Sequence, residues 1–322
     1  MLAARQSVMS IVKSCYNTAH MIKAEHLSKK YRKKVAVDDI SFTVETGKVT
    51  GFLGPNGAGK STTMRLMLGL DNGGGNTTFD GKSLHEYDQP SKVVGVLLEA
   101  KAFHPTRSAR SHLKVLADAG NIPHSRVDEV LDIVGLHDVR RKKPGKFSLG
   151  MSQRLGVAAA ILGKPKYLIL DEPANGLDPE GIAWLRDFLK EYADQGNAVF
   201  VSSHLLSEMA LMADNVVVIG KGKMIADSSM KALVSGKGHS SVFVRSNKQK
   251  ILEAALAKAG LIAKSVDDGL AVQGAKSDDI GKLAFKEGIT ILELAPHMAS
   301  LEDTFLEITA DVQEYQSQKG SK

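Results

Sequence analysis

Apolar runs bounded by turn residues alternate with helical patterns over the first two thirds of the chain. The apolar runs predict buried strands at Val49–Leu53, Val93–Leu98, Tyr167–Leu170 and Ala198–Val201. Between them, apolar residues recur at helical spacing at Met64, Met67 and Leu68, over Ala109–Ala119, over Val127–Val134 and in an alanine-rich stretch through Leu162. Strands that alternate with helices in this way predict an α/β fold.

Two segments that flank this region show the strand pattern without helices. Residues 21–45 alternate in polarity, and Val216–Ile219 and Met224–Ala226 predict two strands joined by a glycine-containing turn. The glycine-rich stretch 235–238 then has the composition of a linker. Residues 21–235 are therefore expected to form one domain.

The rest of the chain predicts a second, smaller domain over residues 240–310. Its strands and helices are expected, in chain order, at Ser241–Arg245, Gln249–Ala259, Leu261–Val266, Leu270–Gln273, Asp278–Lys286 and Ile289–Leu294. The order β-α-β-β-α-β is that of a ferredoxin-like α+β fold, and a last helix is expected to start at Ser300. No catalytic cluster lies here, so we expect a packing or regulatory module.

Composition narrows the class of protein. The chain has 322 residues, of which 43% are hydrophobic, enough for the cores of two domains. No apolar run reaches the ~20 residues that a membrane-spanning helix needs, so a soluble or peripheral protein is expected. Cys15 is the single cysteine, which excludes an internal disulfide framework and fits a reducing compartment.

The two ends of the chain are expected to be disordered. Residues 1–20 contain basic residues and serines but no acid, as in a transit peptide, yet they lack the apolar centre of a secretory signal. We interpret them as a disordered extension, because a strand pattern starts at Met21. The polar residues 311–322 are expected to be a flexible tail.

The charge pattern does not favour nucleic acid as a partner. The net charge is +6, but the 42 basic and 36 acidic residues are mostly interspersed. The basic loop Arg140–Lys146 contains no aromatic side chain that could stack on a base. A solvated basic surface is the simpler interpretation, and no specific nucleic-acid partner is expected.

A glycine-rich loop follows the first apolar strand and leads into a helical pattern. It matches the motif GxxxxGK followed by Ser or Thr, and its residues are Gly54, Pro55, Asn56, Gly57, Ala58, Gly59, Lys60, Ser61 and Thr62. The glycines let backbone N–H groups converge, and the following helix points its positive dipole end at the same place, so an anion is expected there. Lys60 can reach the outer phosphates of a nucleotide, and the Ser61 hydroxyl can ligate Mg²⁺. The complete motif in this context disfavours the alternative of a plain glycine-rich turn.

Two carboxylates follow the apolar strand Tyr167–Leu170, at Asp171 and Glu172. Carboxylates at the end of a buried strand are costly unless they hold a metal or a water. Beside a phosphate-binding loop, Asp171 is expected to bind Mg²⁺ directly or from its second sphere, and Glu172 to activate water.

Three further residues are candidates for the same site. Ser148 precedes the alanine-rich helix and is placed to cap it, so this helix N-terminus is a second anion site. His204 follows the strand Ala198–Val201, at the same end of the sheet as the two carboxylates. Tyr31 lies in the basic turn Lys29–Lys34, where it could pack or could offer a ring to an adenine.

Together these motifs resemble those of the ATP-binding subunits of ABC transporters, over about residues 21–235. The chain closely resembles the branch that serves ABC-2-type exporters, such as those giving resistance to bacitracin and to lantibiotics. The matching motifs are Walker A (Gly54–Thr62), a glutamine-loop position (Glu99), an LSGGQ-type signature (Phe147–Met151), Walker B (Tyr167–Asp171, then Glu172), the D-loop (Ala174–Asp178) and the switch histidine (His204). The resemblance implies a P-loop NTPase fold of ABC type, with a RecA-like core, an antiparallel β subdomain and a helical subdomain.

The resemblance also implies a role for individual residues. Glu172 would be the general base, His204 the sensor of the γ-phosphate, and Tyr31 the residue that stacks on adenine. Ser148 and Gly150 would contact the γ-phosphate of the nucleotide that is held by the other subunit.

The remaining implied ligands complete a site for ATP and Mg²⁺. Asp178 of the D-loop belongs to the nucleotide-binding set, and the ligands of Mg²⁺ would be Ser61, Glu99 and Asp171. Because residues of the facing subunit complete each site, hydrolysis should require a head-to-tail dimer of two copies. The resemblance further implies an ATPase that powers an exporter and is bound, on the cytoplasmic face of the membrane, to separate polytopic permease subunits.

Two positions depart from the general pattern of the family. Glu99 replaces the usual glutamine, and the signature reads FSLGM in place of LSGGQ. Both variants are familiar in the exporter branch, so they indicate the subfamily.

Two other classes of protein are alternatives. A soluble ABC-type ATPase acting on ribosomes or nucleic acid would carry two cassettes, or a long coiled coil between Walker A and the signature, and this sequence has neither. A nucleotide-binding regulator without turnover is disfavoured because Lys60, Asp171, Glu172 and His204 are all present.

Overall fold

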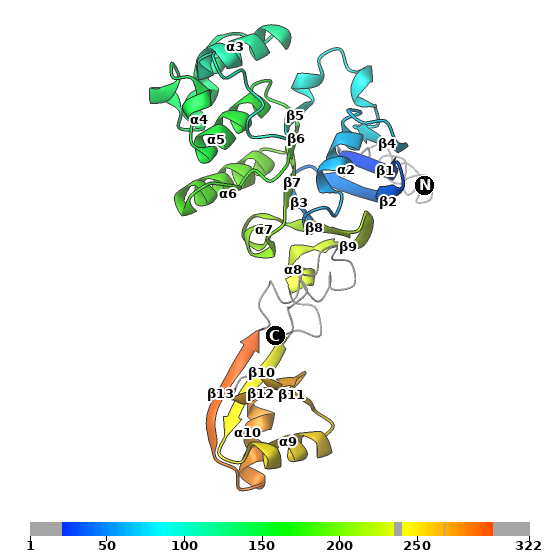
Figure 1. The fold of residues 1–322 in the computed structure, drawn as a ribbon, viewed down its shortest axis with the longest axis vertical. Helices are drawn as coiled ribbons and strands as arrows, with labels where there is room; N and C mark the ends of the chain where they lie inside the picture. The colour runs from blue at the N-terminus through cyan, green and yellow to red at the C-terminus, as the bar shows by residue number, and fades with distance from the viewer. Residues whose placement is uncertain (1–20, 235–239, 267, 299–322) are drawn as a thin grey trace, which may run out of the picture. The chain divides into compact units, whose positions relative to one another are not determined.

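The computed structural model describes residues 21–234, 240–266 and 268–298. The chain divides into two compact units, and the boundary falls between Met230 and Lys231, a few residues before the linker expected from the sequence. Figure 1 shows both units in colours that follow the chain. The terminal segments 1–20 and 311–322 and the helix expected from Ser300 lie outside the described residues.

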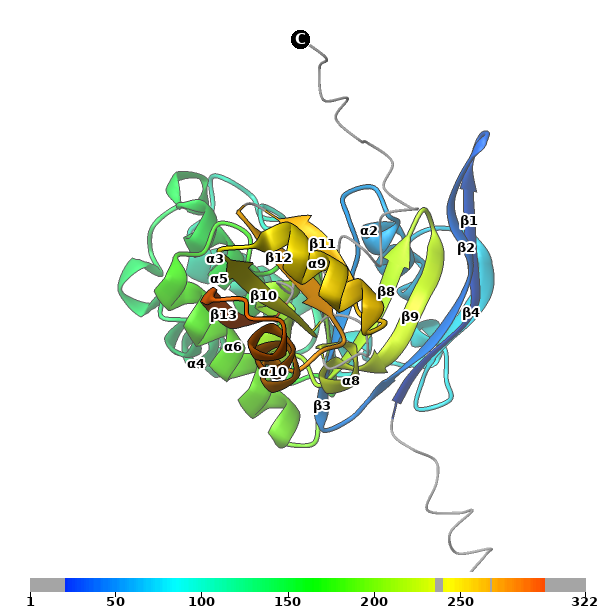
Figure 2. The same ribbon diagram turned by 90° about the horizontal axis from the view of Figure 1, so that it is seen from below.

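The first unit begins with an antiparallel sheet in the order β2-β1-β4, which lies along one side of the unit in Figure 2. Its strands are β1 (Met21–Tyr31), β2 (Lys34–Glu45) and β4 (Gly74–Phe79). The turn predicted over Lys29–Lys34 is present but shorter, because β1 continues to Tyr31 and β2 starts at Lys34. Arg32 adopts a left-handed φ of 52°, which allows a hairpin with a two-residue loop.

A six-stranded sheet forms the centre of the first unit, in the order β5-β6-β7-β3-β8-β9. Its strands are β3 (Lys48–Leu53), β5 (Val94–Leu97), β6 (Tyr167–Leu170), β7 (Ala198–Ser203), β8 (Asn215–Gly220) and β9 (Lys223–Ser229). The first five strands of this order run parallel, and β9 pairs with β8 antiparallel. Every residue of β6 and β7 is buried, as expected for strands covered on both faces. The α/β class predicted from the sequence is confirmed.

The main core fills the space between the two sheets, where α2 (Lys60–Met67) packs against β1, β2 and β4. Phe42, Phe52 and Phe200 come from three different strands and stack in this core. The ring centroids of Phe42 and Phe200 are 5.2 Å apart, and those of Phe52 and Phe200 are 5.0 Å apart. Met64 of α2 is fully buried beside them, so the helix that follows the glycine-rich loop is held by apolar packing.

The other helices of the first unit form two groups. One group packs on itself and against β5, and consists of α3 (Ala109–Ala119), α4 (Ser125–Ile133) and α5 (Leu149–Ala160). The second group contacts β3 and β7, and consists of α6 (Pro179–Asp194) and α7 (Leu206–Met212). Shorter segments are the 3-10 turns η1 (Leu84–Glu86), η2 (Pro90–Lys92), η3 (His137–Val139) and η4 (Pro144–Lys146). The short helix α8 (Met230–Val234) starts at the boundary between the two units.

The second unit has the element order β-α-β-β-α-β. Its elements are β10 (Ser240–Ser246), α9 (Gln249–Lys258), β11 (Ile262–Val266), β12 (Gly269–Gln273), α10 (Ser277–Lys286) and β13 (Ile291–Met298). The four strands pair antiparallel in the order β11-β12-β10-β13, and α9 packs beside α10. Val244, Leu252, Leu256 and Val272 are fully buried in its own core.

Among the residues that the structure describes, none of the helices is long and apolar enough to pass through a lipid bilayer.

Candidate active site

The candidate residues of the first unit gather where parallel strands end. The loop Gly54–Gly59 follows β3, Asp171 and Glu172 follow β6, and His204 follows β7. Because β6, β7 and β3 are neighbours and run parallel, their carboxyl ends meet at one edge of the sheet. In α/β proteins this edge is where ligands bind.

The glycines of the loop are required by its geometry. Gly57 and Gly59 have φ values of 81° and 110°, which side chains rarely allow. A Cβ on Gly54 would lie 2.6 Å from the carbonyl oxygen of Ile219, and one on Gly59 would lie 2.4 Å from that of Ala36. The loop therefore keeps its shape because it is packed tightly between neighbouring strands.

Lys60 lies across the mouth of this loop. Its Nζ donates to the carbonyl oxygen of Gly54 at 2.6 Å and is 3.2 Å from Oε1 of Glu172. Only 7% of its side chain is exposed. Ser61, the next residue, is exposed at the start of α2, and no side chain caps this helix. A basic group beside an uncapped helix N-terminus fits the phosphates of a nucleotide.

The two carboxylates are held in different ways. Asp171 is 9% exposed, and its Oδ1 accepts a short hydrogen bond from the Ser202 hydroxyl. The same hydroxyl oxygen accepts the backbone N–H of Glu172 at 2.8 Å. Glu172 has a left-handed φ of 47°, a conformation that costs about 1–3 kcal/mol for a residue with a side chain. The surroundings hold this residue in a strained geometry.

His204 completes a chain of charged and polar groups. Its Nδ1 lies 2.9 Å from Oε2 of Glu172, whose other oxygen faces Lys60. The hydroxyl of Ser203 receives the N–H of Leu205 at 3.0 Å, which fixes the turn after β7. The structure thus brings Lys60, Glu172 and His204 together, as their positions in the sequence predict.

A magnesium ion would need ligands from both protein and nucleotide. Within the described residues, no group of three or more His, Cys, Asp or Glu side chains forms a metal site. The Ser61 hydroxyl and the Asp171 carboxylate are oxygen donors of the type that Mg²⁺ prefers, and phosphates would supply further ones. The donor set therefore fits Mg²⁺ carried by a nucleotide.

Glu99 is placed differently from the other proposed Mg²⁺ ligands. It is exposed in the loop after β5. Among the described residues, no hydrogen bond or ion pair joins its carboxylate to Asp171 or Glu172. It does line a cavity of about 170 Å³ together with Phe103, His112 and Leu116.

Ser148, Gly150 and Asp178 lie at the starts of two other helices. Ser148 caps α5 by accepting the N–H of Met151 at 3.2 Å. Asp178 caps α6 by accepting the N–H of Gly181 at 2.9 Å. Over the part of the chain that the structure describes, no hydrogen bond or ion pair links these residues to Lys60.

Tyr31 stands at the end of β1 with 47% of its surface exposed. Its hydroxyl donates to Asp71 at 2.8 Å, and Arg65 of α2 contacts the same carboxylate at 2.9 Å. Arg65, and then Tyr31, lowers the pKa of Asp71 to about 2. These contacts tie Tyr31 to the helix that follows the phosphate loop, and Nζ of Lys29 lies over its ring, 4.9 Å from the centroid.

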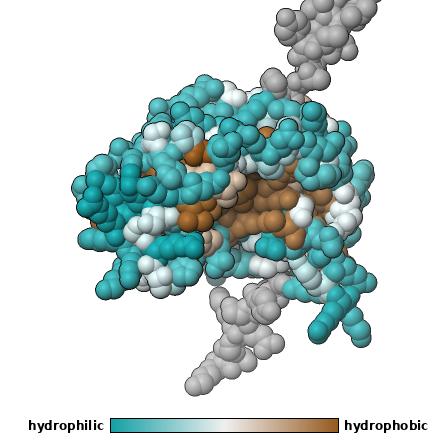
Figure 3. Space-filling view, turned by 90° about the horizontal axis from the view of Figure 1, so that it is seen from above, coloured by the Kyte–Doolittle hydropathy of each residue, from teal (hydrophilic) through white to brown (hydrophobic). Residues whose placement is uncertain are grey.

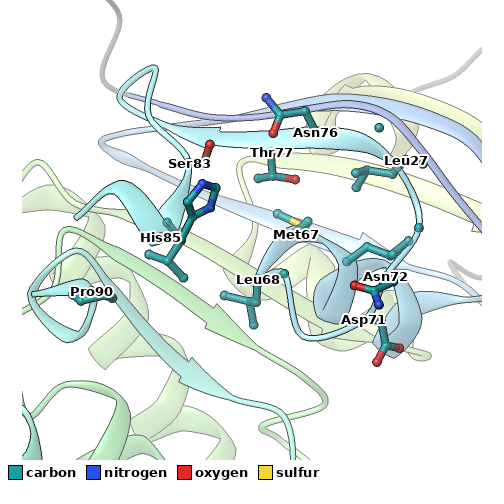
Figure 4. Close-up of a pocket in the computed structure, with 16 residues that line it drawn as sticks. Leu27, Met67, Leu68, Asp71, Asn72, Asn76, Thr77, Ser83, His85 and Pro90 are labelled. Carbon is teal, nitrogen blue, oxygen red and sulfur yellow. The ribbon is translucent and has the colours of Figure 1, made fainter. Parts of the chain in front are cut away.

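A cavity of about 430 Å³, shown in Figure 4, lies beside Asp71, the hydrogen-bond partner of Tyr31. It is formed by the end of α2, by β4 and by the segment around Ser83 and His85. None of the residues predicted for nucleotide binding is among those that line it. The site is therefore identified by its chemistry and not by the size of a cavity.

Two residues of the site were missed by sequence reasoning. Ser202 bonds to the carboxylate of Asp171 and to the backbone N–H of Glu172. Gln153 of α5 donates to the backbone carbonyl of Glu172. Each is a polar residue inside an otherwise buried strand or helix, which is the signal that could have found them.

Comparisons with known proteins give matches for both units of the chain. The sequence profile described as "ABC transporter" matches residues 37–175, and a domain of unknown function, DUF8746, matches residues 240–302. The uncharacterized ABC transporter ATP-binding protein YhcH of Bacillus subtilis (strain 168) is 38% identical over 300 residues, which cover 91% of this chain and 97% of that protein.

Two relatives with more specific names are also similar. The bacitracin transport ATP-binding protein BcrA of Bacillus licheniformis is 35% identical and spans 89% of this chain and 97% of its own length. The lantibiotic transport ATP-binding protein SrtF of Streptococcus pyogenes is 36% identical over 64% of this chain and 90% of its own length.

A solved structure, titled "Structure of ATP binding subunit of ABC transporter", has the same fold. It superposes with a TM-score of 0.60 at 23% identity and covers 82% of this chain and 99% of its own. The fold class that the sequence predicted for residues 21–235 is thereby confirmed.

Proposed function

Because the chain belongs to the ATP-binding proteins of ABC transporters, we propose that it hydrolyses ATP to drive export through separate membrane permease subunits. The observation that carries this proposal is the contact of Glu172 with both Lys60 and His204, at the mouth of the glycine-rich loop. A carboxylate between a phosphate-binding lysine and a histidine is placed to act on a water beside the γ-phosphate.

Each residue of the site has a separate role in hydrolysis. Lys60 and the N-terminus of α2 bind the phosphates and offset their charge. Glu172 accepts the proton of the attacking water. His204 holds the Glu172 carboxylate through Nδ1 and presents its other ring nitrogen to the γ-phosphate. Mg²⁺, held by Ser61, Asp171 and phosphate oxygens, would neutralise the charge that develops on the transferred group.

Two copies of the chain form the complete site in this proposal. Ser148 and Gly150 stand at the N-terminus of α5, which points positive backbone dipoles outward. The γ-phosphate held by the facing copy is the anion that would bind there. Asp178 lies on the D-loop side of the same surface, and Tyr31 stacks on the adenine of its own nucleotide.

The permease is proposed to bind near Glu99. Figure 3 shows apolar residues gathered in a hollow on the face of the molecule seen from above. The 170 Å³ cavity that Glu99 lines also includes Val96, Leu98 and Phe103, which are apolar. Apolar concave surfaces of this kind accept side chains of a partner protein. Through the permease the chain would sit on the cytoplasmic face of the cell membrane.

Export is proposed from the relatives. Two of them are named for transport of bacitracin and of lantibiotics. A second copy and a polytopic permease are thus the proposed protein partners.

The function is tested by trapping the complete site. Glu172→Gln removes the base but keeps a polar side chain of the same size, so ATP should stay bound between two copies. Gel filtration with saturating ATP and Mg²⁺ should show a dimer that dissociates in ADP. A purely monomeric elution with bound ATP would contradict the two-copy site.

A further inference from the structure

Helix α5 contains a buried glutamine that contacts the catalytic loop. Gln153 is 4% exposed, and its Nε2 donates to the carbonyl oxygens of Glu172 at 3.2 Å and of Asn175 at 3.3 Å. The reversed amide would place Oε1 against both carbonyl oxygens, so these contacts establish its orientation. Oε1 itself has no hydrogen-bond partner among the described residues.

A buried amide with an unsatisfied oxygen does not favour folding by itself. An apolar side chain of the same volume would fill the space without that penalty. What an apolar side chain would not provide is a pair of N–H donors to two backbone carbonyls. The contacts of Gln153 therefore point to a role in placing the loop 172–175.

The backbone of Glu172 is held from both sides. Its N–H donates to the hydroxyl of Ser202 at 2.8 Å, and its carbonyl accepts from Gln153. This residue has the left-handed φ of 47°, which needs support from its surroundings. The two contacts keep the carboxylate directed at Lys60 and His204.

The same helix contacts the D-loop one turn earlier. A Cβ on Gly150 would lie 3.1 Å from the carbonyl oxygen of Gly176, so the first turn of α5 touches the D-loop backbone. Ser148 begins this helix. A shift of α5 therefore reaches both ends of the segment 172–176.

We propose that Gln153 is a positioning residue that couples the two nucleotide sites of a dimer. When the nucleotide of the facing copy engages Ser148, α5 moves as a rigid element, and Gln153 carries this movement to Glu172 of its own chain. Each base then adopts its productive geometry only when the other site is filled. This proposal rests on the two-copy site of the proposed function.

Mixed dimers of two differently tagged chains test whether Gln153 acts on Glu172 of its own chain, the step on which the coupling depends. One chain carries Glu172→Gln, so that hydrolysis occurs only at the site that uses the intact Glu172 of the other chain. Gln153→Met is then placed either in the chain with the intact Glu172 or in the chain with Glu172→Gln. Met has nearly the volume of Gln but donates no hydrogen bond.

Only the first arrangement should impair turnover. With Gln153→Met beside the intact Glu172, kcat should fall about 10- to 100-fold, the effect expected of a misplaced catalytic group, with the KM for ATP little changed. With Gln153→Met in the other chain, kcat should stay within about twofold. Equal losses in both arrangements, a loss only in the second, or no loss in either would overturn the proposal.

Two controls separate placement from folding. Gln195→Met makes the same change at an exposed glutamine after α6 and should leave kcat within about twofold. Gln153→Asn keeps the amide but is one methylene shorter, and it should give the same loss beside the intact Glu172. If Gln153→Met does not fold, normal turnover of Gln153→Asn would still overturn the proposal.

The failure of the proposed function has a different signature. If Glu172→Gln chains bind ATP and remain monomeric, the two-copy site is wrong and the coupling falls with it. If dimers form and Gln153 has no same-chain effect, only the coupling is wrong.

Discussion

The two units of this protein bury apolar side chains in the same way but differ in their buried polar residues. Among the described residues, the first unit buries eleven that are polar or charged, and these include Lys60, Gln153, Asp171 and Ser202 at or beside the carboxyl edge of its sheet. Among the described residues of the second unit, only Ser246 is polar and buried. Buried polar groups cost stability unless they are paired, so they persist where chemistry needs them. The comparison assigns the chemistry to the first unit.

Both units expose large apolar side chains, such as Leu70 and Leu211 in the first unit. The second unit exposes large apolar side chains, with 88% of Phe285, 64% of Ile262 and 56% of Leu292 accessible. Its charged residues form surface pairs such as Arg245 with Glu293. A unit of this kind is suited to packing and contact, and its changes should leave ATP chemistry intact.

The largest difference is expected when a carboxylate is neutralised in each unit. Glu172→Gln should keep ATP binding and lower turnover about 10²–10⁴-fold, the usual contribution of a general base. Glu293→Gln in β13 is the matched control and should leave turnover within about twofold. Steady-state ATPase assays of both variants measure the contrast, and a similar loss in both would remove the distinction between the units.

A core substitution in the second unit tests whether the first unit binds and hydrolyses ATP independently of the second. Leu256 is fully buried in α9, so Leu256→Ala should destabilise that unit by about 2–5 kcal/mol. ATP affinity and turnover of the first unit should remain within about twofold. Denaturant unfolding and ATPase assays on the same sample decide it. Parallel loss of stability and turnover would show that the units act as one.

The lysine of the loop should control affinity more than rate. Lys60→Ala removes a charged donor to the phosphates, and hydrogen bonds to charged groups are worth about 1.5–3 kcal/mol, so ATP affinity should fall about 10- to 100-fold. Lys258→Ala, at an exposed position of α9, is the control and should bind ATP normally. Calorimetry provides the measurement. Unchanged affinity of the Lys60 variant would mean that the loop holds another ligand.

The smallest effect is expected at Glu99, where the first unit is proposed to meet its membrane partner. A carboxylate there would attract Mg²⁺ and repel the γ-phosphate, two opposed effects of about 4 kcal/mol per unit charge pair at ~4 Å in a dielectric near 20, so they largely cancel. Glu99→Gln should therefore retain the ATPase activity of the isolated dimer. Glu99→Ala should weaken stimulation by the permease in reconstituted complexes. Full stimulation of the alanine variant would disprove the coupling role.

The site could be predicted from sequence where local pattern determines structure. The glycine loop needs positive φ angles at Gly57 and Gly59, so glycines recur at fixed positions that can be recognised in the sequence. The apolar strand before Asp171 similarly places the carboxylates at a sheet edge. Residues that directly follow a predicted parallel strand could therefore be identified as candidates for the site.

Contacts between distant segments were not predictable in this way. Ser202 bonds to Glu172 from a neighbouring strand, and Gln153 bonds to it from a helix. Because these residues are far apart in the sequence, no local motif predicts either contact. The turn after Tyr31 is shorter than expected because pairing with β2 extends β1 beyond its apolar residues. Tertiary pairing in these cases overrides the local preference.

The central claim, that each site is built from two copies, is tested most directly by complementation. Ser148→Asp keeps the helix cap but sets a negative charge against the facing nucleotide, so dimers of this variant should hydrolyse ATP slowly. Dimers of Glu172→Gln should also be nearly inactive, because they lack the base.

Mixing the two inactive variants is the decisive measurement. A mixed dimer contains one site with the intact Glu172 of one chain and the intact Ser148 of the other. ATPase activity should therefore rise above that of both components, to at most about a quarter of the wild-type rate, because half of the dimers are mixed and each has one complete site. Coupling through Gln153 would keep the rate below this limit, since the chain with the intact Glu172 carries Ser148→Asp. A mixture no more active than its two components would contradict a site shared between two copies.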